Sequence, residues 1–377
     1  MSIHSNLKSR SRNRSILAAI TLFASLYAPI SAQKLVSFDA PGGGTGPYQG
    51  TESAAINIEG AITGTVVDSS YGIHGFVRSP DGKFVNFDAP DANPVVGCTC
   101  PNAINDLGVV AGEYFDSNSV SHGFLRFPDG KIISFDAPGA GTAANQGTFP
   151  YGVNDFGLTA GYFNDANNAS HSFLRSPDGK ITVIDPPDAG TAAYQGSYAV
   201  SVNNFGTLAG TFTDANNLNH GFVRAPDGKI TTFDPPGAVG GTVGTLNALV
   251  TDLGLIAGDY IDANSSVSFG FERTPSGKYI AYQASEAGSA PFDGTWLDAV
   301  NIEGATTGYV TDANLENHSF IRDPCGHITV FDVPGQIAVP NSYLGSAGEG
   351  INASGVVAGR WHDAAYAAHG YILYPRK

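Results

Sequence analysis

Seven segments of 48 to 51 residues repeat along almost the whole chain, and this period restricts the fold more than any single motif does. One turn position marks each copy: Asn57, Asn105, Asn154, Asn203, Thr251, Asn301 and Asn352. Repeats of this length with strand-like content are typical of closed radial arrays of small sheets. The 48 glycines and 22 prolines fit short strands joined by tight turns better than helices.

The copy at residues 201–234 shows how a repeat divides into strands. A first strand ends at the turn 203–206, and three more are expected at 208–213, 220–224 and 229–234. Four short antiparallel strands joined by tight turns make one propeller blade. Every second strand contains a glycine, such as Gly210, and an aromatic residue follows it 12 or 13 positions later. We expect these rings to pack between blades over the glycine gaps.

The last copy stops after its third strand, and the missing strand is found near the N-terminus. Residues 34–39 (KLVSFD) match residues 83–88 (KFVNFD) position for position. The N-terminal strand should therefore complete the seventh blade and remove the free sheet edges. We predict an all-β, seven-bladed β-propeller with four-stranded antiparallel blades, forming one domain over 33–377. Its blades are expected at about 53–90, 101–139, 150–187, 199–236, 247–284, 297–334, and 348–377 plus 33–41.

The first 32 residues have the pattern of a secretory signal peptide. Four basic residues precede an apolar stretch at 16–30, and a small residue, Ala32, precedes the expected cleavage point. A retained N-terminal anchor is the alternative. Loss of the four basic residues would change the net charge from −15 to about −19. Such a chain repels nucleic acid and anionic membranes, so we expect neither as a partner. Secretion or a periplasmic location follows from this interpretation, with no membrane span after cleavage.

Short motifs in the third strands carry a resemblance to a known family. The triplets His122-Gly123-Phe124 and His171-Ser172-Phe173, with the turn glycines upstream, resemble the extracellular HAF-type repeat. The Ser-Pro-Asp-Gly-Lys strings at 79–83 and 176–180 are also similar to WD40-like propeller repeats of periplasmic proteins. The HAF resemblance covers nearly all of residues 34–377 and implies an exported protein, but it implies no activity.

Polar residues that recur in register favour structural roles. Six copies pair an aspartate with a histidine six residues later, as in Asp165 and His171. One active site needs one constellation and not six, so we expect a hydrogen-bond bracket across the hairpin. Third-strand arginines and fourth-strand aspartates, such as Arg175 and Asp185, should form partly buried ion pairs. The Thr or Ser six residues before each turn position should brace the backbone.

The three cysteines interrupt the repeat. Cys98 and Cys100 share one connection between blades, whereas Cys325 lies in a turn expected on the opposite face. An oxidising compartment makes a Cys98–Cys100 disulfide possible, with free thiols as the alternative, and Cys325 should bond to neither. Two thiols alone are a poor metal site, so we expect no bound metal there.

Function should reside in the connections that depart from the repeat. The long connections between blades and the Asp-Ala-Asn tips share one face, which we call the variable-loop face. Aromatic, amide and carboxylate side chains of this kind suit sugars or a peptide, although several could be packed loop residues. The ligand-binding candidates are Tyr48, Gln49, Gln146, Tyr194, Gln195, Trp296, Asp298, Tyr343 and Trp361.

These residues predict a binding or scaffold module more than an enzyme. Its ligand would be a glycan or a cell-envelope protein, and the chain would be a monomer without a cofactor. The Asp/Asn-rich tips could hold Ca²⁺, but they lack the ligand spacing of a known loop. The alternative is an extracellular polysaccharide hydrolase or lyase with Asp298 as its acid, although no second carboxylate is specified by spacing.

Overall fold

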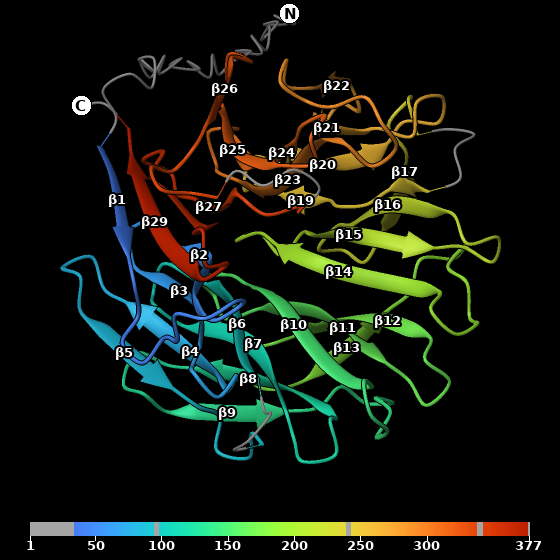
Figure 1. Ribbon diagram of the computed structural model, residues 1–377. Helices are drawn as coiled ribbons and strands as arrows, with labels where there is room; N and C mark the ends of the chain where they lie inside the picture. Colours follow the sequence, from blue (N-terminus) through green and yellow to red (C-terminus); the bar gives the residue numbers. More distant parts are fainter. Residues whose placement is uncertain (1–33, 94–97, 239–242, 338–341, 376–377) are drawn as a thin grey trace, which may run out of the picture.

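The computed structural model describes residues 34–93, 98–238, 243–337 and 342–375. The signal peptide predicted for residues 1–32 lies outside this part of the chain. The described residues form strands and turns, with no helix among them. Figure 1 shows the small sheets arranged around a central axis, which confirms the predicted all-β propeller.

The antiparallel pairings divide the described strands into seven sets, which we call blades 1 to 7. Blade 1 contains β2 (Gly50–Ile56), β3 (Ile62–Val67), β4 (Ile73–Arg78) and β5 (Phe84–Phe87). Blade 2 contains β6 (Thr99–Ile104), β7 (Val110–Phe115), β8 (Ser121–Arg126) and β9 (Ile132–Phe135). Blade 3 contains β10 (Gly147–Val153), β11 (Thr159–Asn164), β12 (Ser170–Arg175) and β13 (Ile181–Ile184).

The remaining blades follow the same order from the axis outward, and the first strand of blade 5 is divided in two. Blade 4 contains β14 (Gly196–Val202), β15 (Leu208–Thr213), β16 (Asn219–Arg224) and β17 (Ile230–Phe233). Blade 5 contains β18 (Gly244–Thr245), β19 (Leu249–Val250), β20 (Ile256–Ile261), β21 (Ser268–Arg273) and β22 (Tyr279–Tyr282). Blade 6 contains β23 (Gly294–Val300), β24 (Thr306–Thr311), β25 (Asn317–Arg322) and β26 (Ile328–Phe331). Blade 7 contains β27 (Ser346–Ile351), β28 (Val357–His362), β29 (Ala368–Tyr374) and β1 (Lys34–Phe38).

The ring is closed by its first strand, as predicted. β1 pairs antiparallel with β29, from Lys34 opposite Tyr374 to Phe38 opposite Gly370. The Trp361 indole N–H also donates to the Ser37 hydroxyl over 2.8 Å. These contacts join residues more than 300 positions apart, so the two ends of the described chain belong to one blade (Figure 1).

Each blade is joined to the next by one parallel bridge. The first residue of an inner strand pairs with the start of the third strand in the preceding blade, as Gly50 does with Ala368 and Gly147 with Ser121. Similar bridges join Gly196 to Ser170, Gly244 to Asn219, Gly294 to Ser268, Cys98 to Ile73 and Gly345 to Asn317. The Thr or Ser that follows the bridging residue braces the backbone with its hydroxyl, as predicted. For example, the Ala40 N–H donates to Thr51 Oγ1.

The turn asparagines that mark the repeat form a chain of bonds around the ring. The side-chain amide of Asn57 donates to the main-chain oxygen of Asn105, and Asn105 does the same to Asn154. Each carboxamide oxygen also accepts a main-chain N–H four residues later, which closes its own turn. Thr251 has no amide to continue this pattern, and its buried hydroxyl has no hydrogen-bond partner in the described part of the chain.

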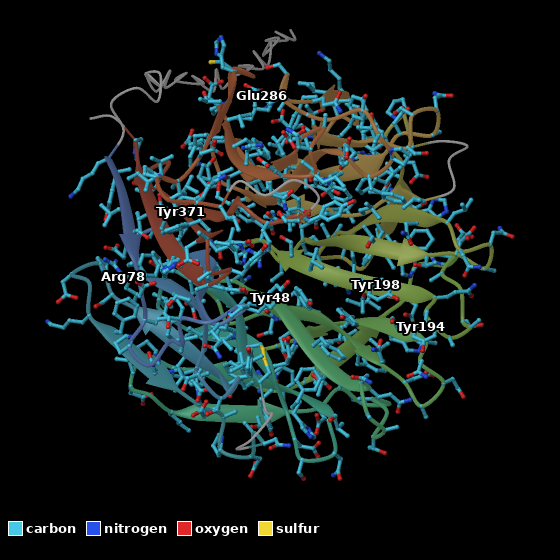
Figure 2. The ribbon with its side chains drawn as sticks, in the orientation of Figure 1. Tyr48, Arg78, Tyr194, Tyr198, Glu286 and Tyr371 are labelled. Atoms are coloured by element: carbon cyan, nitrogen blue, oxygen red, sulfur yellow. A yellow bond between two sulfur atoms is a disulfide. The ribbon has the colours of Figure 1, made fainter. Side chains whose placement is uncertain are left out.

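Aromatic side chains fill the spaces between blades. Phe76, Phe124, Phe173, Phe222, Phe271, Phe320 and Tyr371 are fully buried. Each third-strand ring is paired across the sheet with a second-strand glycine, as Phe76 is with Gly64. Figure 2 shows the side chains filling the ring, with Tyr371 among those of blade 7. These rings therefore have the predicted core role.

The predicted pairing of third-strand arginines with fourth-strand aspartates is wrong. The Arg126 guanidinium lies 4.8 Å from the ring centroid of Phe87 in the preceding blade, and Arg175 lies equally close to Phe135. This cation–π contact uses the flat guanidinium to cover an aromatic side chain between blades. The planar stacking leaves the fourth-strand aspartates free to bond elsewhere.

Those aspartates accept hydrogen bonds from the repeated histidines instead. The His318 Nδ1–H donates to Asp332 over 2.7 Å, and its Nε2 lies 3.7 Å from Asp312 across the hairpin. The Asp312 carboxylate in turn accepts the main-chain N–H groups of Asn314 and Glu316. Six blades contain this arrangement. The Asp–His contact predicted across the hairpin is thus present at 3.4 to 3.9 Å, but the shorter hydrogen bond of each histidine goes to the fourth-strand aspartate.

Candidate functional site

A β-bulge interrupts the innermost strand in six of the blades. The pairing of β2 with β3 shifts between Ser53 and Ala55, so Ala54 is the extra residue. A bulge turns a side chain away from the alternation of its strand, and this commonly happens beside functional sites. The bulge residues are Ala54, Asn102, Tyr151, Val200, Asp298 and Glu349, and all six line one cavity.

The repeated second-strand glycine is required by the close approach of a main-chain carbonyl from the strand beside it. A methyl group on Gly64 would come within 3.0 Å of the main-chain oxygen of Glu52 and the Cα of Ser53. Glycine at the corresponding position of every other blade likewise faces a first-strand carbonyl. We expected the third-strand ring to be the reason for this glycine, and the ring is a close neighbour of Gly161, Gly258 and Gly359. The main-chain carbonyl is the more general cause, because every one of these glycines meets one.

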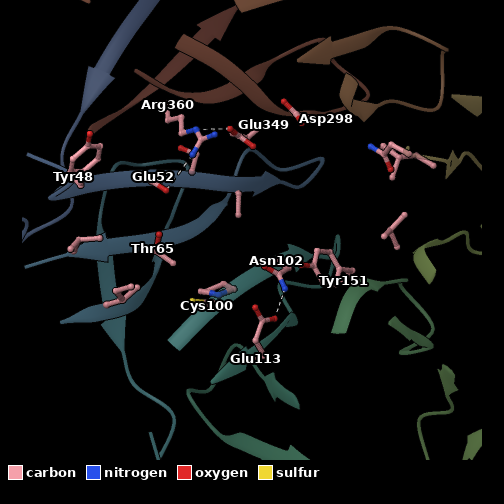
Figure 3. A pocket seen from close by; sticks show the side chains of 18 residues that line it. Tyr48, Glu52, Thr65, Cys100, Asn102, Glu113, Tyr151, Asp298, Glu349 and Arg360 are labelled. Carbon is pink, nitrogen blue, oxygen red and sulfur yellow. Dashed lines mark hydrogen bonds and ion pairs between the residues drawn. The ribbon is translucent and has the colours of Figure 1, made fainter. Parts of the chain in front are cut away.

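The cavity has a volume of about 700 Å³ and lies around the axis of the ring (Figure 3). Tyr48 from a long connection and Val67 and Ile73 from the β3–β4 tip line it, so it belongs to the variable-loop face. A smaller cavity of about 220 Å³ lies among the turn residues of the other face, such as Asn105 and Asn154. The larger cavity is the candidate functional site.

One cation in the lining of the larger cavity is already paired. The Arg360 Nε lies 2.8 Å from a Glu349 carboxylate oxygen, and Nη1 lies 3.4 Å from Glu52 (Figure 3). The Glu349 charge raises the pKa of Arg360, so the guanidinium stays protonated. These three side chains come from β28, β27 and β2, and they join blade 7 to blade 1 across the cavity wall.

Two other carboxyl groups in the lining form no ion pair with the described residues. Glu113 on β7 is 8% exposed and accepts a 2.5 Å hydrogen bond from the Asn102 amide. The Oδ2 atom of Asp298 on β23 is buried and has no hydrogen-bond partner among the described residues. Burial raises the pKa of Glu113 to about 8. Burial, with repulsion from Glu349, also raises the pKa of Asp298 well above its ordinary value.

The residue after each second-strand glycine varies between blades and adds polar groups near the axis. Thr65, Glu113 and Arg360 at this position line the cavity. Other blades have Tyr162, Asp259 or Tyr309 there. Burial raises the pKa of Asp259 to about 7. Burial also raises the pKa of Tyr309, which Asp298 raises further.

Aromatic rings extend one side of this region. Tyr151 lies at the cavity wall, 37% exposed, and its ring stacks on that of Tyr162 at a centroid distance of 5.7 Å. Tyr198 packs edge-on against the other side of Tyr162. Burial raises the pKa of Tyr151 to about 12, so this hydroxyl remains a hydrogen-bond donor at neutral pH.

Apart from Asp298, the predicted site residues divide into three groups, of which the tyrosines are exposed. Tyr48, Tyr194 and Tyr343 are 65%, 79% and 53% exposed, and each has a positive φ between 52° and 65°. Of these, Tyr48 lines the cavity. Figure 2 shows Tyr194 near the outer edge of the ring, away from the axis where Tyr48 lies. The structure therefore brings Tyr48 and Asp298 to the same cavity and separates Tyr194 from them.

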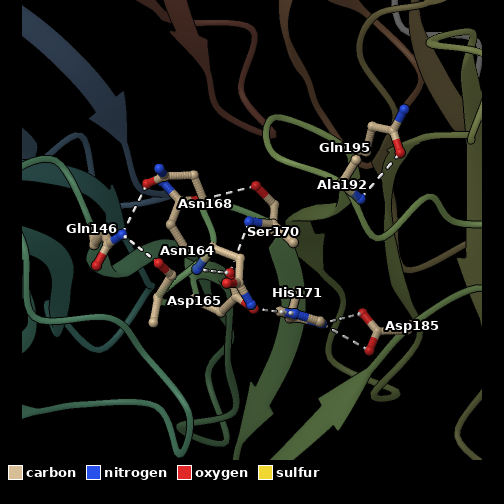
Figure 4. A network of polar contacts seen from close by, with 12 residues as sticks. Gln146, Asn164, Asp165, Asn168, Ser170, His171, Asp185, Ala192 and Gln195 are labelled. Atoms are coloured by element: carbon tan, nitrogen blue, oxygen red, sulfur yellow. Dashed lines mark hydrogen bonds and ion pairs between the residues drawn. The ribbon is translucent and has the colours of Figure 1, made fainter.

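The three predicted glutamines are buried braces of the connections. The Gln146 side-chain oxygen accepts the Ala143 N–H, and its amide donates to the Asn168 side-chain oxygen over 3.0 Å (Figure 4). Gln195 repeats both bonds in the next blade, and Gln49 accepts the Gly46 N–H. Their amide groups thus hold each long connection to the hairpin tip beside it.

The two tryptophans lie outside the cavity lining. Trp361 is 9% exposed, and its ring stacks on His369 at a centroid distance of 4.4 Å. This packing, with the bond to Ser37, gives Trp361 a role in closing blade 7. Trp296 stacks on Tyr309 at 6.0 Å, and its buried indole nitrogen has no partner in the described part of the chain.

The cysteines pair as one of the two expected alternatives. Cys98 and Cys100 form a disulfide, and Cys100 lines the cavity. Cys325 is a free, exposed thiol, in agreement with its predicted place away from the other two.

Within the described ranges, one set of side chains has metal-ligand geometry, at the β24–β25 tip. Potential ligand atoms of Asp312, Glu316 and His318 lie within 4.8 Å of one another. Asp312 and His318 already bond within their bracket, so this set adds no support to the Ca²⁺ alternative.

Sequence reasoning missed four of the charged residues in this region, namely Glu52, Glu113, Glu349 and Arg360. They lie inside strands, whereas the predicted site residues come from the connections between blades. The signal was present, because the residue after the second-strand glycine is Thr, Glu, Tyr, Thr, Asp, Tyr and Arg in successive copies. A strand position that varies between otherwise regular blades identifies the axis-facing residues.

No protein-family model matches the sequence, and no curated protein matches it either. Several solved structures do resemble its fold. A streptogramin B lyase structure is 16% identical over 91% of this chain and 98% of its own, with a TM-score of 0.57. The BP39L lectin from Burkholderia pseudomallei is 8% identical over 87% and 97%, with a TM-score of 0.55. A puromycin hydrolase structure is 12% identical over 85% of this chain and 50% of its own, with a TM-score of 0.51.

At such low identity these likenesses show the fold alone. The three proteins differ in activity, because their names describe a lyase, a lectin and a hydrolase. A propeller scaffold carries unrelated functions on different sites, so the shared fold selects none of them. Among the described residues there is also no helix long and apolar enough to cross a membrane.

Proposed function

We propose that this chain is an exported β-propeller that binds a glycan in the central cavity of its variable-loop face. The observation that carries the proposal is the set of six bulges, which direct six different side chains into one cavity. The blades are otherwise regular, and the variation is concentrated where a ligand would lie. The volume of about 700 Å³ is within the range of small-ligand sites.

The lining has the chemistry that a sugar requires. Tyr151 and Tyr48 offer aromatic faces for the apolar side of a sugar ring, and Asn102, Glu113 and Asp298 offer hydrogen bonds to hydroxyls. A cell-envelope protein is the other ligand that the sequence suggests. Protein surfaces usually meet over broad and fairly flat areas, so a concave cavity at the axis favours the smaller ligand.

The test is a glycan array probed with the purified protein, followed by calorimetry on each sugar that binds. Tyr151→Ala should weaken binding at least tenfold, because it removes the exposed ring from the cavity wall. Tyr194→Ala is the matched control, since it removes a tyrosine that is exposed but lies outside the lining. Equal losses in the two variants, or no binding to any glycan, would contradict the proposal.

A second candidate, a polysaccharide hydrolase or lyase, is favoured by one observation. The raised pKa of Glu113, about 8, keeps a carboxylic acid protonated near neutral pH, which general acid catalysis requires. Glycan hits should therefore be incubated with the protein and analysed for cleavage. Cleavage that Glu113→Gln or Asp298→Asn abolishes would favour the enzyme, whereas binding without products favours the binding module.

A further inference from the structure

We propose that the glycan bound in the central cavity carries free, protonated amino groups, and that Glu113 and Asp298 receive them. This inference rests on the proposed function and names the class of sugar. It follows from the charges in the lining, from the pairing of Arg360, and from a buried carboxylate oxygen without a partner.

The charges of the lining do not balance. Four carboxyl groups, those of Glu52, Glu113, Asp298 and Glu349, line the cavity together with one cation, Arg360. The guanidinium is held by Glu349 at 2.8 Å and Glu52 at 3.4 Å. Glu113 and Asp298 therefore have no ion-pair partner among the described residues, and they lie on different blades across the same cavity (Figure 3).

Both carboxyl groups have fewer hydrogen-bond partners among the described residues than a carboxylate can take. The Asp298 Oδ2 atom has no partner among the described residues. Glu113 is 92% buried and has one side-chain donor, Asn102. An ammonium group has three donors and a charge that compensates a buried carboxylate, so it satisfies both needs at once.

A neutral sugar hydroxyl offers a smaller gain at these positions. It brings one donor and no charge, whereas hydrogen bonds between ionised partners are roughly twice as strong as neutral ones. The overall charge of −15 also attracts a cationic ligand before contact. The sugar therefore gains affinity from its amines, and Tyr151 and Tyr48 contact the rest of the ring.

Binding of an amine should release protons. Burial holds Glu113 protonated in the empty cavity, where it faces Asn102 on β6, Tyr151 on β10 and Tyr162 on β11, with no cation among them. An ammonium beside this carboxyl would lower its pKa and expel the proton.

Asp298 has a more mixed environment. It faces Glu349 on β27, Arg360 on β28, Asp259 on β20 and Tyr309 on β24. Burial and the Glu349 charge raise the pKa of Asp298 while Arg360 lowers it, so an arriving ammonium should cause the same proton loss there. A neutral sugar causes no such loss in either carboxyl group.

The experiment compares a 6-amino-6-deoxyglucose oligosaccharide with the glucose oligosaccharide of equal length, by calorimetry near pH 7. An aliphatic amine of this kind stays protonated at that pH. We expect the amino sugar to bind at least tenfold more tightly. Titrations in two buffers of different ionisation enthalpy should show net proton release for the amino sugar and none for glucose.

Three variants test the residues. Glu113→Gln and Asp298→Asn should each remove most of the preference for the amino sugar, measured as the ratio of its affinity to that of the glucose oligosaccharide in the same variant. Glu286→Gln is the matched control, because it replaces the same carboxyl group at an exposed site outside the lining. Thermal unfolding of each variant shows whether it is folded.

The outcomes separate the two proposals. Equal affinity for both sugars, or an amino-sugar preference that Glu286→Gln lowers as much as Glu113→Gln does, overturns the inference and leaves glycan binding in place. Binding of neither sugar, with no hit on the wider glycan array, overturns the proposed function as well.

Discussion

The side-chain amide of Asn352 donates a 3.1 Å hydrogen bond to the main-chain oxygen of Asn57, which is 295 residues away in the sequence. This contact joins blade 7 to blade 1 on the face opposite the large cavity. The same bond links the other neighbours around the ring, from Asn57 to Asn105, Asn154, Asn203 and Thr251, and from Asn301 to Asn352. The most regular residue of the repeat therefore holds the blades to one another.

Asn352→Ala should lower the free energy of unfolding by about 1–3 kcal/mol, because it leaves a buried carbonyl and its own turn unsatisfied. Denaturant unfolding followed by circular dichroism measures the loss. Asn167→Ala is the control, since that amide contacts Asp165 at an exposed tip and should change stability by less than about 0.5 kcal/mol. Equal effects in the two variants would contradict a role for the amide chain between blades.

The break at Thr251 predicts a stabilising substitution. Thr251→Asn would place an amide between Asn203 and Asn301, where the buried Thr251 hydroxyl now has no partner among the described residues. Restoring the bond should raise the free energy of unfolding by about 1 kcal/mol. Thr251→Val separates this effect from loss of the hydroxyl, and a Thr251→Asn protein no more stable than Thr251→Val would show that the ring cannot be completed here.

Deletion of residues 34–39 should leave blade 7 with an open edge. β29 would lose its antiparallel partner β1, and Trp361 and His369 would lose their bonds to Ser37 and Asp39. An unpaired strand edge favours association between chains, so the deletion should give aggregates in size-exclusion chromatography. A stable monomer with an unchanged unfolding transition would mean that ring closure does not depend on β1.

Substitution of a second-strand glycine should be far more costly than its change in size suggests. In Gly64→Ala the new methyl group meets the Glu52 carbonyl, which cannot move without opening the bulge, so we expect a loss of about 3 kcal/mol or more. Gly60→Ala provides the comparison, because Gly60 has a φ of +86° but open space around it. That change should cost about 1 kcal/mol. Similar losses in thermal unfolding would argue against the carbonyl contact.

Most of the fold could be predicted because each blade repeats the same information. The turn at Asn203, the glycine at 210 and the ring of Phe222 recur at fixed spacing, so seven weak signals support one another. Ring closure could be predicted because residues 34–39 match another copy. The pairing of Arg126 with Phe87 could not, because spacing places two residues on neighbouring strands without showing which blade each side chain faces.

The site was harder to predict because it depends on bulges. An extra residue in one strand can be recognised only against the register of its partner, which the sequence does not contain. Asp298 is a candidate in the sequence because it lies close to Trp296. It reaches the cavity for a different reason, because the pairing of β23 with β24 shifts at that residue. Glu113 and Arg360 have no bulge, and the signal for them in the sequence is that each follows the repeated second-strand glycine at a position that varies between copies.

The unpaired carboxyl of Glu113 should make the stability of the empty protein depend on pH. Its pKa is raised by burial from an ordinary value of 4.5 to about 8. A raised pKa means that the folded protein holds a proton that the unfolded chain loses, so the contribution is full below about pH 4.5 and is lost as the pH rises through about 8. The free energy of unfolding should therefore fall across this window, by as much as about 5 kcal/mol from this group. In Glu113→Gln this position cannot titrate, so the free energy of unfolding should fall less steeply with pH. Denaturant unfolding should therefore show the stability of the variant rising relative to that of the native protein between pH 5 and pH 8.5. Glu286→Gln should follow the native curve. Parallel curves for all three proteins would show that Glu113 is ionised in the empty cavity, and that a proton is not what an arriving amine displaces.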